Sequence, residues 1–203
     1  MDYAEGLFLG KLWSDTDYEN RNHAGLFILY GLLTDCVILY NFYFGKNLLG
    51  LGSFGTVHIV LLILLFLASP FICFKYYRMP VWGKGLVLAE KVFKAYLILD
   101  LTVSLIMPRI TIEKDGLQDS LINWLNGTLE TYTEKFSGDA GSFSTVMGVL
   151  AGGLHTVFVI LLWIVALVVI PGLIYIVYRI LQYMYDWVME KLVIRKLFAG
   201  YRK

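Results

Sequence analysis

Long apolar runs separated by polar stretches dominate the chain. A helix of about 20 residues crosses the roughly 30 Å hydrocarbon core of a bilayer, so four of these runs are long enough to span it. The candidate spans are Ala24 to Phe44, Thr56 to Phe74, Gly85 to Met107 and Thr145 to Tyr178. The pattern predicts an all-α membrane protein, a bundle of about four transmembrane helices that forms a single transmembrane domain over residues 1–203.

The fourth run is longer than one crossing requires. Its 34 residues would form about 51 Å of helix at 1.5 Å per residue. We expect a tilted helix, a break at Gly152-Gly153 or a bend or stop near Pro171. We favour Pro171 because proline removes a helical hydrogen bond. A cytoplasmic amphipathic helix is expected beyond it, over residues 179–203.

Two further amphipathic segments are expected outside the spans. The first precedes Ala24 at the N-terminus. The second lies in the outer loop, residues 108–144, where leucine recurs every four residues at Leu117, Leu121, Leu125 and Leu129. This spacing gives a helix with one apolar face. Such a helix lies on the membrane surface or packs against a neighbouring subunit.

Basic residues set the expected orientation, because cytoplasmic loops carry an excess of lysine and arginine. Lys75, Arg78 and Lys84 lie between spans two and three, and the tail after Tyr178 holds six more basic residues. The stretch Pro108 to Ser144 has three basic and six acidic residues and is therefore expected outside. We expect both termini in the cytoplasm, in a plasma or bacterial cytoplasmic membrane.

Composition supports lipid as the main surroundings and excludes several functional classes. The chain is 58% hydrophobic and 16% charged, with a net charge of +1. Soluble domains carry about 25% charged residues. Near-zero net charge gives no reason to expect nucleic acid. Cys36 and Cys73 both lie in apolar runs, which favours buried thiols over a disulfide framework or a zinc site. The sequence predicts no catalytic residues, cofactor or metal site and no enzyme activity.

The segment Gly50 to Val57, GLGSFGTV, matches the glycine-rich loop of kinases letter for letter. Such a loop needs a following strand lysine, a catalytic aspartate motif and a D-F-G sequence, and none is present. A dinucleotide loop needs a preceding strand. We therefore interpret this segment as a turn between two helices.

Ionisable residues at membrane depth are the most specific signal, because each is costly there. On span three, Glu90, Lys94, Asp100 and Ser104 share a helical face about 120° wide at 100° per residue. Asp35 lies near the middle of span one, and His155 lies about a third of the way into span four. Gly148 and Gly152 have the spacing that allows close helix packing, within one chain or between copies.

Two interpretations of these residues stay open. In the first, the polar face of span three, with Asp35 and His155, lines a conduit, and the protein is a pore or channel that works as a homo-oligomer. In the second, the polar groups hold the helices together. The protein is then a non-conducting membrane scaffold, an immunity protein or the membrane partner of a soluble cytoplasmic effector bound through the basic C-terminal helix.

Overall fold

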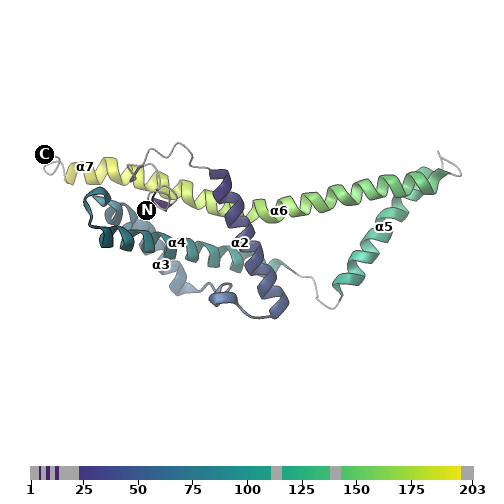
Figure 1. Cartoon of the computed structure of the whole chain (residues 1–203), viewed down its shortest axis with the longest axis horizontal. Helices are drawn as coiled ribbons and strands as arrows, with labels where there is room; N and C mark the ends of the chain where they lie inside the picture. Colours follow the sequence, from purple (N-terminus) through teal and green to yellow (C-terminus); the bar gives the residue numbers. More distant parts are fainter. Residues whose placement is uncertain are drawn as a thin grey trace. The chain divides into compact units, whose positions relative to one another are not determined.

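Every regular element in the described part of the chain is helical (Figure 1). The computed structural model describes Glu5, Phe8, Leu9, Leu12, Trp13 and residues 23–110, 116–137 and 143–197. The long helices are α2 (His23–Phe44), α3 (Thr56–Cys73), α4 (Val81–Ile106), α5 (Leu117–Ser137) and α6 (Ser144–Met189). The short elements are η1 (Leu48–Gly50), η2 (Tyr76–Arg78), η3 (Met107–Arg109), the π-helix η5 (Glu190–Ile194) and α7 (Arg195–Leu197).

The all-α prediction is confirmed for these residues. Most of the predicted N-terminal amphipathic segment, parts of the outer loop and residues 198–203 lie outside them. Among the described residues, three helical segments are long and apolar enough to cross a membrane: Gly25–Phe44, Thr56–Cys73 and Ser144–Leu197. The third predicted span corresponds to α4, which has 26 residues but carries several charges. Its crossing stays a prediction.

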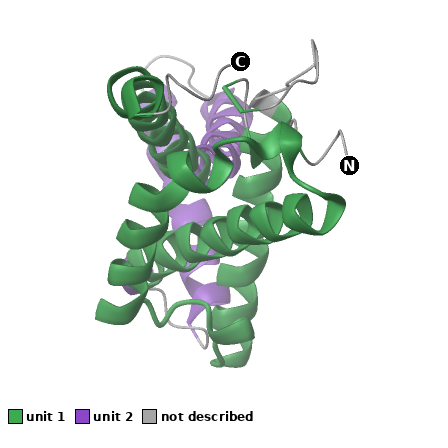
Figure 2. Ribbon diagram, turned by 90° about the vertical axis from the view of Figure 1, so that its left-hand side faces the viewer, with its two compact units in different colours: residues 1–107, 170–203 green, residues 108–169 purple. Residues whose placement is uncertain are grey.

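The chain divides into two compact units (Figure 2). The first unit comprises Met1–Met107 and Ile170–Lys203, and the second comprises Pro108–Val169. Helix α6 therefore contributes residues to both.

The first unit buries polar side chains and exposes apolar ones. Lys91 and Lys94 of α4 are 6% and 5% exposed, and Asp100 is 1% exposed. In contrast, Ile63 and Leu64 of α3 are 53% and 56% exposed. Water-soluble proteins bury few lysines and expose few large aliphatic residues in such runs. The inverted distribution is the one expected where hydrocarbon surrounds the helices.

The C-terminal part of α6 continues this inverted pattern. Helix α6 runs to Met189 with Pro171 inside it, so the predicted stop at Pro171, like the alternative break at Gly152-Gly153, is wrong. Beyond the proline, Gln182 and Asp186 are buried, whereas Ile180 and Met184 are more than half exposed. The polar face of this segment therefore points into the first unit.

The second unit pairs α5 with the start of α6. A Cβ atom placed on Gly148 would lie 2.5 Å from the Thr133 Cα, and one on Gly152 would lie 3.3 Å from the Leu129 Cα. Gly148 has no room for a side chain, and a side chain at Gly152 would require Leu129 to shift, so the two glycines let the helices approach closely. The Thr156 hydroxyl donates to the Gly152 carbonyl at 2.8 Å. The glycine pair thus makes a contact within one chain.

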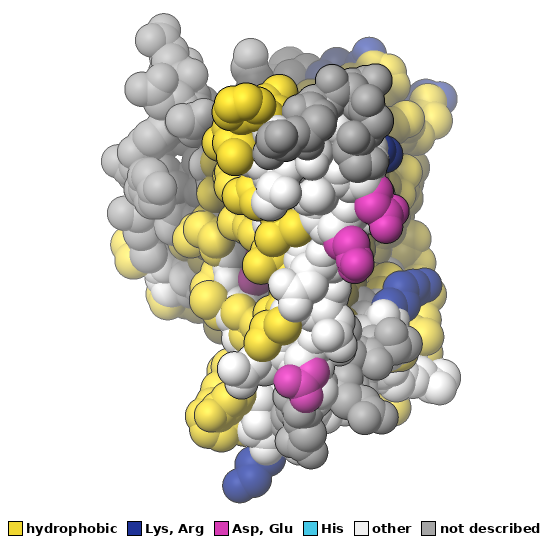
Figure 3. Space-filling model, turned by 90° about the vertical axis from the view of Figure 1, so that its right-hand side faces the viewer, with side chains coloured by type: hydrophobic (Ala, Val, Ile, Leu, Met, Phe, Trp, Pro, Cys, Tyr) yellow, Lys and Arg dark blue, Asp and Glu magenta, His cyan; other side chains and the backbone are white. Residues whose placement is uncertain are grey.

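The other end of α5 keeps its apolar face uncovered within the chain. Leu121 and Leu125, which belong to the predicted leucine stripe, are 55% and 40% exposed. In Figure 3, hydrophobic side chains gather on one side of the face in view, and acidic side chains lie on the other. The helix is amphipathic, as its leucine spacing predicts.

Replacing Gly148 with alanine should destabilise the α5–α6 packing, because its methyl group would meet the Thr133 backbone. Overpacking of this kind costs about 1–3 kcal/mol. Gly153→Ala is the matched control: a Cβ there meets nothing within 4 Å, and alanine favours a helix by about 1 kcal/mol over glycine. Amide hydrogen exchange of α5 in detergent should rise for Gly148→Ala only. Equal protection in both variants would contradict the observed packing.

Candidate functional site

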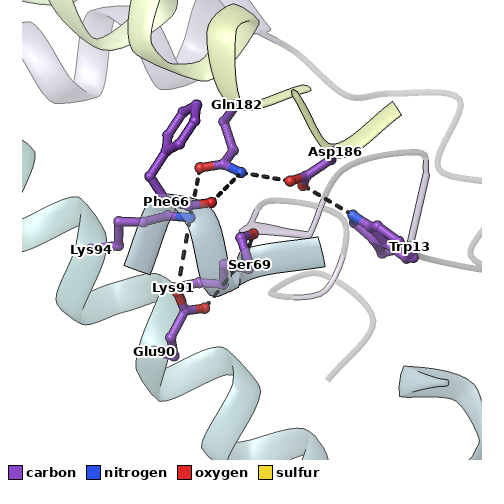
Figure 4. A network of polar contacts seen from close by, with 8 residues as sticks. All are labelled: Trp13, Phe66, Ser69, Glu90, Lys91, Lys94, Gln182 and Asp186. Carbon is purple, nitrogen blue, oxygen red and sulfur yellow. Dashed lines mark hydrogen bonds and ion pairs between the residues drawn. The ribbon is translucent and has the colours of Figure 1, made fainter. Parts of the chain in front are cut away.

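A buried polar network joins three helices of the first unit near one end of α4 (Figure 4). Glu90, Lys91 and Lys94 come from α4, and Ser69 comes from α3. Gln182 and Asp186 come from the C-terminal part of α6. The network brings together residues more than 100 positions apart in the sequence, and we call it the polar core.

Gln182 is the residue through which the polar core connects its helices. Its Oε1 accepts a hydrogen bond from the Lys94 ammonium at 3.1 Å. Its Nε2 donates to Asp186 Oδ1 at 2.6 Å and to the Phe66 carbonyl of α3 at 3.3 Å. An amide can donate and accept at once, so one side chain satisfies groups on all three elements.

The charges of the polar core balance within it. The Lys91 ammonium lies 3.4 Å from Glu90 Oε2 and donates to the Ser69 hydroxyl. The Lys94 ammonium lies 3.8 Å from Glu90 Oε1. Two lysines thus face two carboxylates, those of Glu90 and Asp186. Pairing is what allows ionisable groups to stay buried, because an unpaired charge away from water is far more costly.

Pro70 explains why Gln182 reaches the backbone of α3. Proline has no N–H group, so the carbonyl four residues before it loses its helical partner. That carbonyl belongs to Phe66, and it is the one that accepts the Gln182 Nε2 hydrogen bond. The proline therefore creates an acceptor inside α3, and the polar core uses it.

The N-terminal segment closes this end of the first unit. Trp13 Nε1 donates to Asp186 Oδ2 at 3.0 Å. The same tryptophan belongs to an apolar cluster with Leu9, Cys73, Tyr76 and Ile194. Burial raises the pKa of the Tyr76 hydroxyl above its ordinary value, so that phenol stays neutral. Trp13 therefore contacts both the polar core and this apolar cluster.

A cavity of about 90 Å³ lies beside the polar core. Its lining includes Trp13, Lys94, Tyr178 and Asp186. The Tyr178 hydroxyl is buried without a hydrogen-bond partner among the described residues. Ligand pockets usually measure about 300–1,000 Å³, whereas about 30 Å³ suffices for one water. The cavity has the size for a few water molecules.

A second polar cluster lies toward the opposite end of α4. Asp100 Oδ1 accepts a hydrogen bond from the Gly52 N–H at 2.7 Å, and Ser104 Oγ accepts from the Phe54 N–H at 3.1 Å. Asn41 of α2 donates to the Leu51 carbonyl and accepts from the Leu48 N–H. Asp100 and Ser104 thus hold the loop between α2 and α3.

That loop is the glycine-rich segment that resembles a nucleotide loop. Gly50 and Gly52 have φ angles of 77° and 102°, a backbone conformation that glycine adopts at little cost. Its N–H groups bond to Asp100 and Ser104 rather than pointing at an open phosphate site. The interpretation as a turn between two helices is confirmed.

An apolar layer separates the two polar clusters. Lys94 and Asp100 are six residues apart, which is about 9 Å along a helix. Leu97 and Ile98 lie between them and are 0% and 3% exposed. The polar face of α4 is therefore continuous in sequence but interrupted in space by buried aliphatic side chains, of which Ile98 also lines the cavity.

The remaining predicted residues lie elsewhere. Asp35 of α2 is half-buried and joins neither cluster. His155 is exposed in the second unit, where its ring lies 5.3 Å from that of Tyr132. The structure thus brings Glu90 and Lys94 together and places Asp100 with Ser104. It does not gather all the predicted residues at one site.

Sequence reasoning left Ser69, Trp13 and Asn41 out of the candidate set, and it assigned Gln182 and Asp186 to a cytoplasmic helix. The polar stripe from Arg179 to Glu190 was the signal that could have found the last two.

No protein-family model, curated protein or solved structure matches the chain. The geometry of these clusters is therefore the basis for any functional proposal.

Gln182→Leu should destabilise the protein, and Pro70→Ala should reduce that cost. With alanine at position 70, the Phe66 carbonyl regains its helical donor and no longer depends on Gln182. A buried carbonyl left without a partner costs about 1–3 kcal/mol, so we expect a coupling energy of about 1 kcal/mol between the two substitutions. Free energies of unfolding measured in mixed detergent micelles give this coupling.

Pro171→Ala is the control for this cycle, because Pro171 lies in α6 and does not affect the Phe66 carbonyl. The cost of Gln182→Leu should be unchanged in that background. Additive effects for Gln182→Leu and Pro70→Ala would contradict the role assigned to Pro70.

Proposed function

We propose that this protein is a non-conducting, multi-pass membrane component, whose four spans form a framework for binding another protein. The apolar layer at Leu97 and Ile98 carries the proposal. A conduit along the polar face of α4 would need water or polar groups throughout its length. Buried aliphatic side chains fill that length between Lys94 and Asp100.

Pairing within the chain also supports this proposal. Glu90, Lys91 and Lys94 contact one another and Ser69 or Gln182, and Asp100 bonds to the loop backbone. Groups that line a pore face water instead. Here the charges act as helix-to-helix contacts, which is the common use of polar residues between membrane helices.

The fourth crossing in this proposal is α4. Its charged residues are an obstacle only if they face lipid. Four of the five, Glu90, Lys91, Lys94 and Asp100, are buried or nearly so, and Lys84 lies in the first turn of the helix. With α4 counted, the basic residues around Lys75 to Lys84 and those after Tyr178 lie on the same side. Both termini are then cytoplasmic, and the outer loop with α5, residues 108–144, is outside.

Purified protein reconstituted in liposomes should give no ion flux above that of empty liposomes. Lys94→Gln and Asp100→Asn should leave flux at that background, although both should lower the temperature of unfolding in detergent. The alternative proposal, an oligomeric channel with α4 at its axis, requires a current that these two substitutions alter. Such a current in planar bilayers would overturn the non-conducting proposal.

Single cysteines test the orientation in cells or sealed vesicles, in a chain with Cys36 and Cys73 replaced by serine. An impermeant maleimide should label Lys46→Cys from outside and Lys84→Cys and Lys196→Cys only after permeabilisation. Labelling of Lys84→Cys and Lys196→Cys from opposite sides would exclude the four-span arrangement.

A further inference from the structure

Asp35 is an exception among the ionisable side chains of α2, α3 and α4. Glu90, Lys91 and Lys94 pair in the polar core, and Asp100 accepts from the Gly52 N–H. His58 accepts from the Gly55 N–H at 3.1 Å. Asp35 makes no hydrogen bond or ion pair with any residue that the structure describes. Its carboxyl group therefore needs a partner from elsewhere.

The position of Asp35 in α2 makes the absence of a hydrogen-bond or ion-pair partner energetically costly. It lies nine residues before Phe44 and twelve after His23, at about 13 Å and 18 Å from the two helix ends. In a helix that spans a core of roughly 30 Å, this is close to the middle. Charged residues at that depth face protein or water and seldom face lipid.

The surroundings of Asp35 form a stripe suited to another helix. Ile28, Leu32, Asp35 and Leu39 follow a four-three-four spacing along α2, the spacing at which two helices pack side by side. Ile28 and Leu32 are each 49% exposed, and Leu39 is 65% exposed. We call these four residues the α2 stripe. It is an apolar helix face with one carboxyl group near its centre.

We propose that the α2 stripe binds a transmembrane helix of another protein that carries a lysine or arginine at the depth of Asp35. Charge complementarity decides the kind of partner, because a carboxylate in hydrocarbon is best compensated by a cation. A single polar residue within an apolar helix contact also sets which partner and which register are accepted.

A second copy of this chain is a poorer occupant. Lys91 and Lys94, the lysines in the middle of α4, are buried in the polar core. A symmetric contact through the α2 stripe would place Asp35 opposite Asp35, and like charges repel. This inference rests on the proposed non-conducting membrane role, and it names the partner for which the framework is built.

Synthetic membrane helices serve as probes, in phosphatidylcholine vesicles. Three leucine-alanine peptides are identical except for a central lysine, leucine or glutamate. Energy transfer from labelled protein to labelled peptide measures association. The lysine peptide should bind at least ten times more tightly than the leucine peptide, and Asp35→Asn should reduce this difference to less than twofold. Because Asp35 makes no hydrogen bond or ion pair with any residue that the structure describes, Asp35→Asn should unfold at the same temperature as the parent protein.

Leu39→Trp and Leu33→Trp are matched variants that test the surface rather than the charge. Leu39 belongs to the α2 stripe, whereas Leu33 is 50% exposed on another side of α2. Bulk at position 39 should weaken lysine-peptide binding, and bulk at position 33 should not.

Three results would overturn the inference. These are equal binding of the lysine and leucine peptides, no binding of either, and self-association of the protein that Asp35→Asn abolishes. The liposome flux assay is independent of peptide binding. A current together with selective lysine-peptide binding would reject the non-conducting role and leave the partner assignment standing.

Discussion

The compensation of charge away from water is the constraint on which the first unit depends. Four ionisable groups, those of Glu90, Lys91, Lys94 and Asp186, are enclosed by helices whose outer faces are aliphatic. Each would be very costly if left alone. The ion pairs lie within α4, and hydrogen bonds from Lys91 to Ser69 and from Lys94 to Gln182 join this helix to α3 and α6. Gln182 completes the arrangement, because an amide can satisfy an ammonium, a carboxylate and a backbone carbonyl at once.

The local irregularities of the chain serve this same arrangement. Pro70 frees a carbonyl that Gln182 then occupies, and Gly50 and Gly52 allow the loop to turn its N–H groups toward Asp100 and Ser104. In the second unit, Gly148 and Gly152 let α5 and α6 pack closely through small side chains and not through charged groups. Proline and glycine thus occur where backbone groups form hydrogen bonds with side chains or where two helix backbones pack closely together.

The polar groups of the membrane helices differ in whether their partners lie inside the chain. Within the described residues, Glu90, Lys91, Lys94 and Asp100 of α4 each have an ion pair or a hydrogen bond inside the chain, whereas Asp35 has neither. A protein whose interior is already paired gains nothing from a further internal contact at Asp35. The Asp35 carboxyl group therefore supports the proposed recognition between helices of different proteins. The buried layer at Leu97 and Ile98 is unfavourable for the passage of ions along the polar face of α4.

Several features followed from the sequence alone, because they depend on composition and period. Apolar run length predicted the long helices, leucine spacing predicted α5, and the missing strand and catalytic motifs identified the glycine-rich segment as a turn. The helical period also placed Glu90, Lys94, Asp100 and Ser104 on one face of α4.

Tertiary structure decided what that face does. No local rule states that Gln182 meets Lys94 across 88 positions, or that Leu97 and Ile98 pack closely enough to divide the polar face. Such contacts depend on which helices become neighbours, and periodicity along one helix does not contain that information. The sequence showed that α4 carries charge, and only packing determined that this charge is paired at one place and hydrogen-bonded to a loop backbone at another.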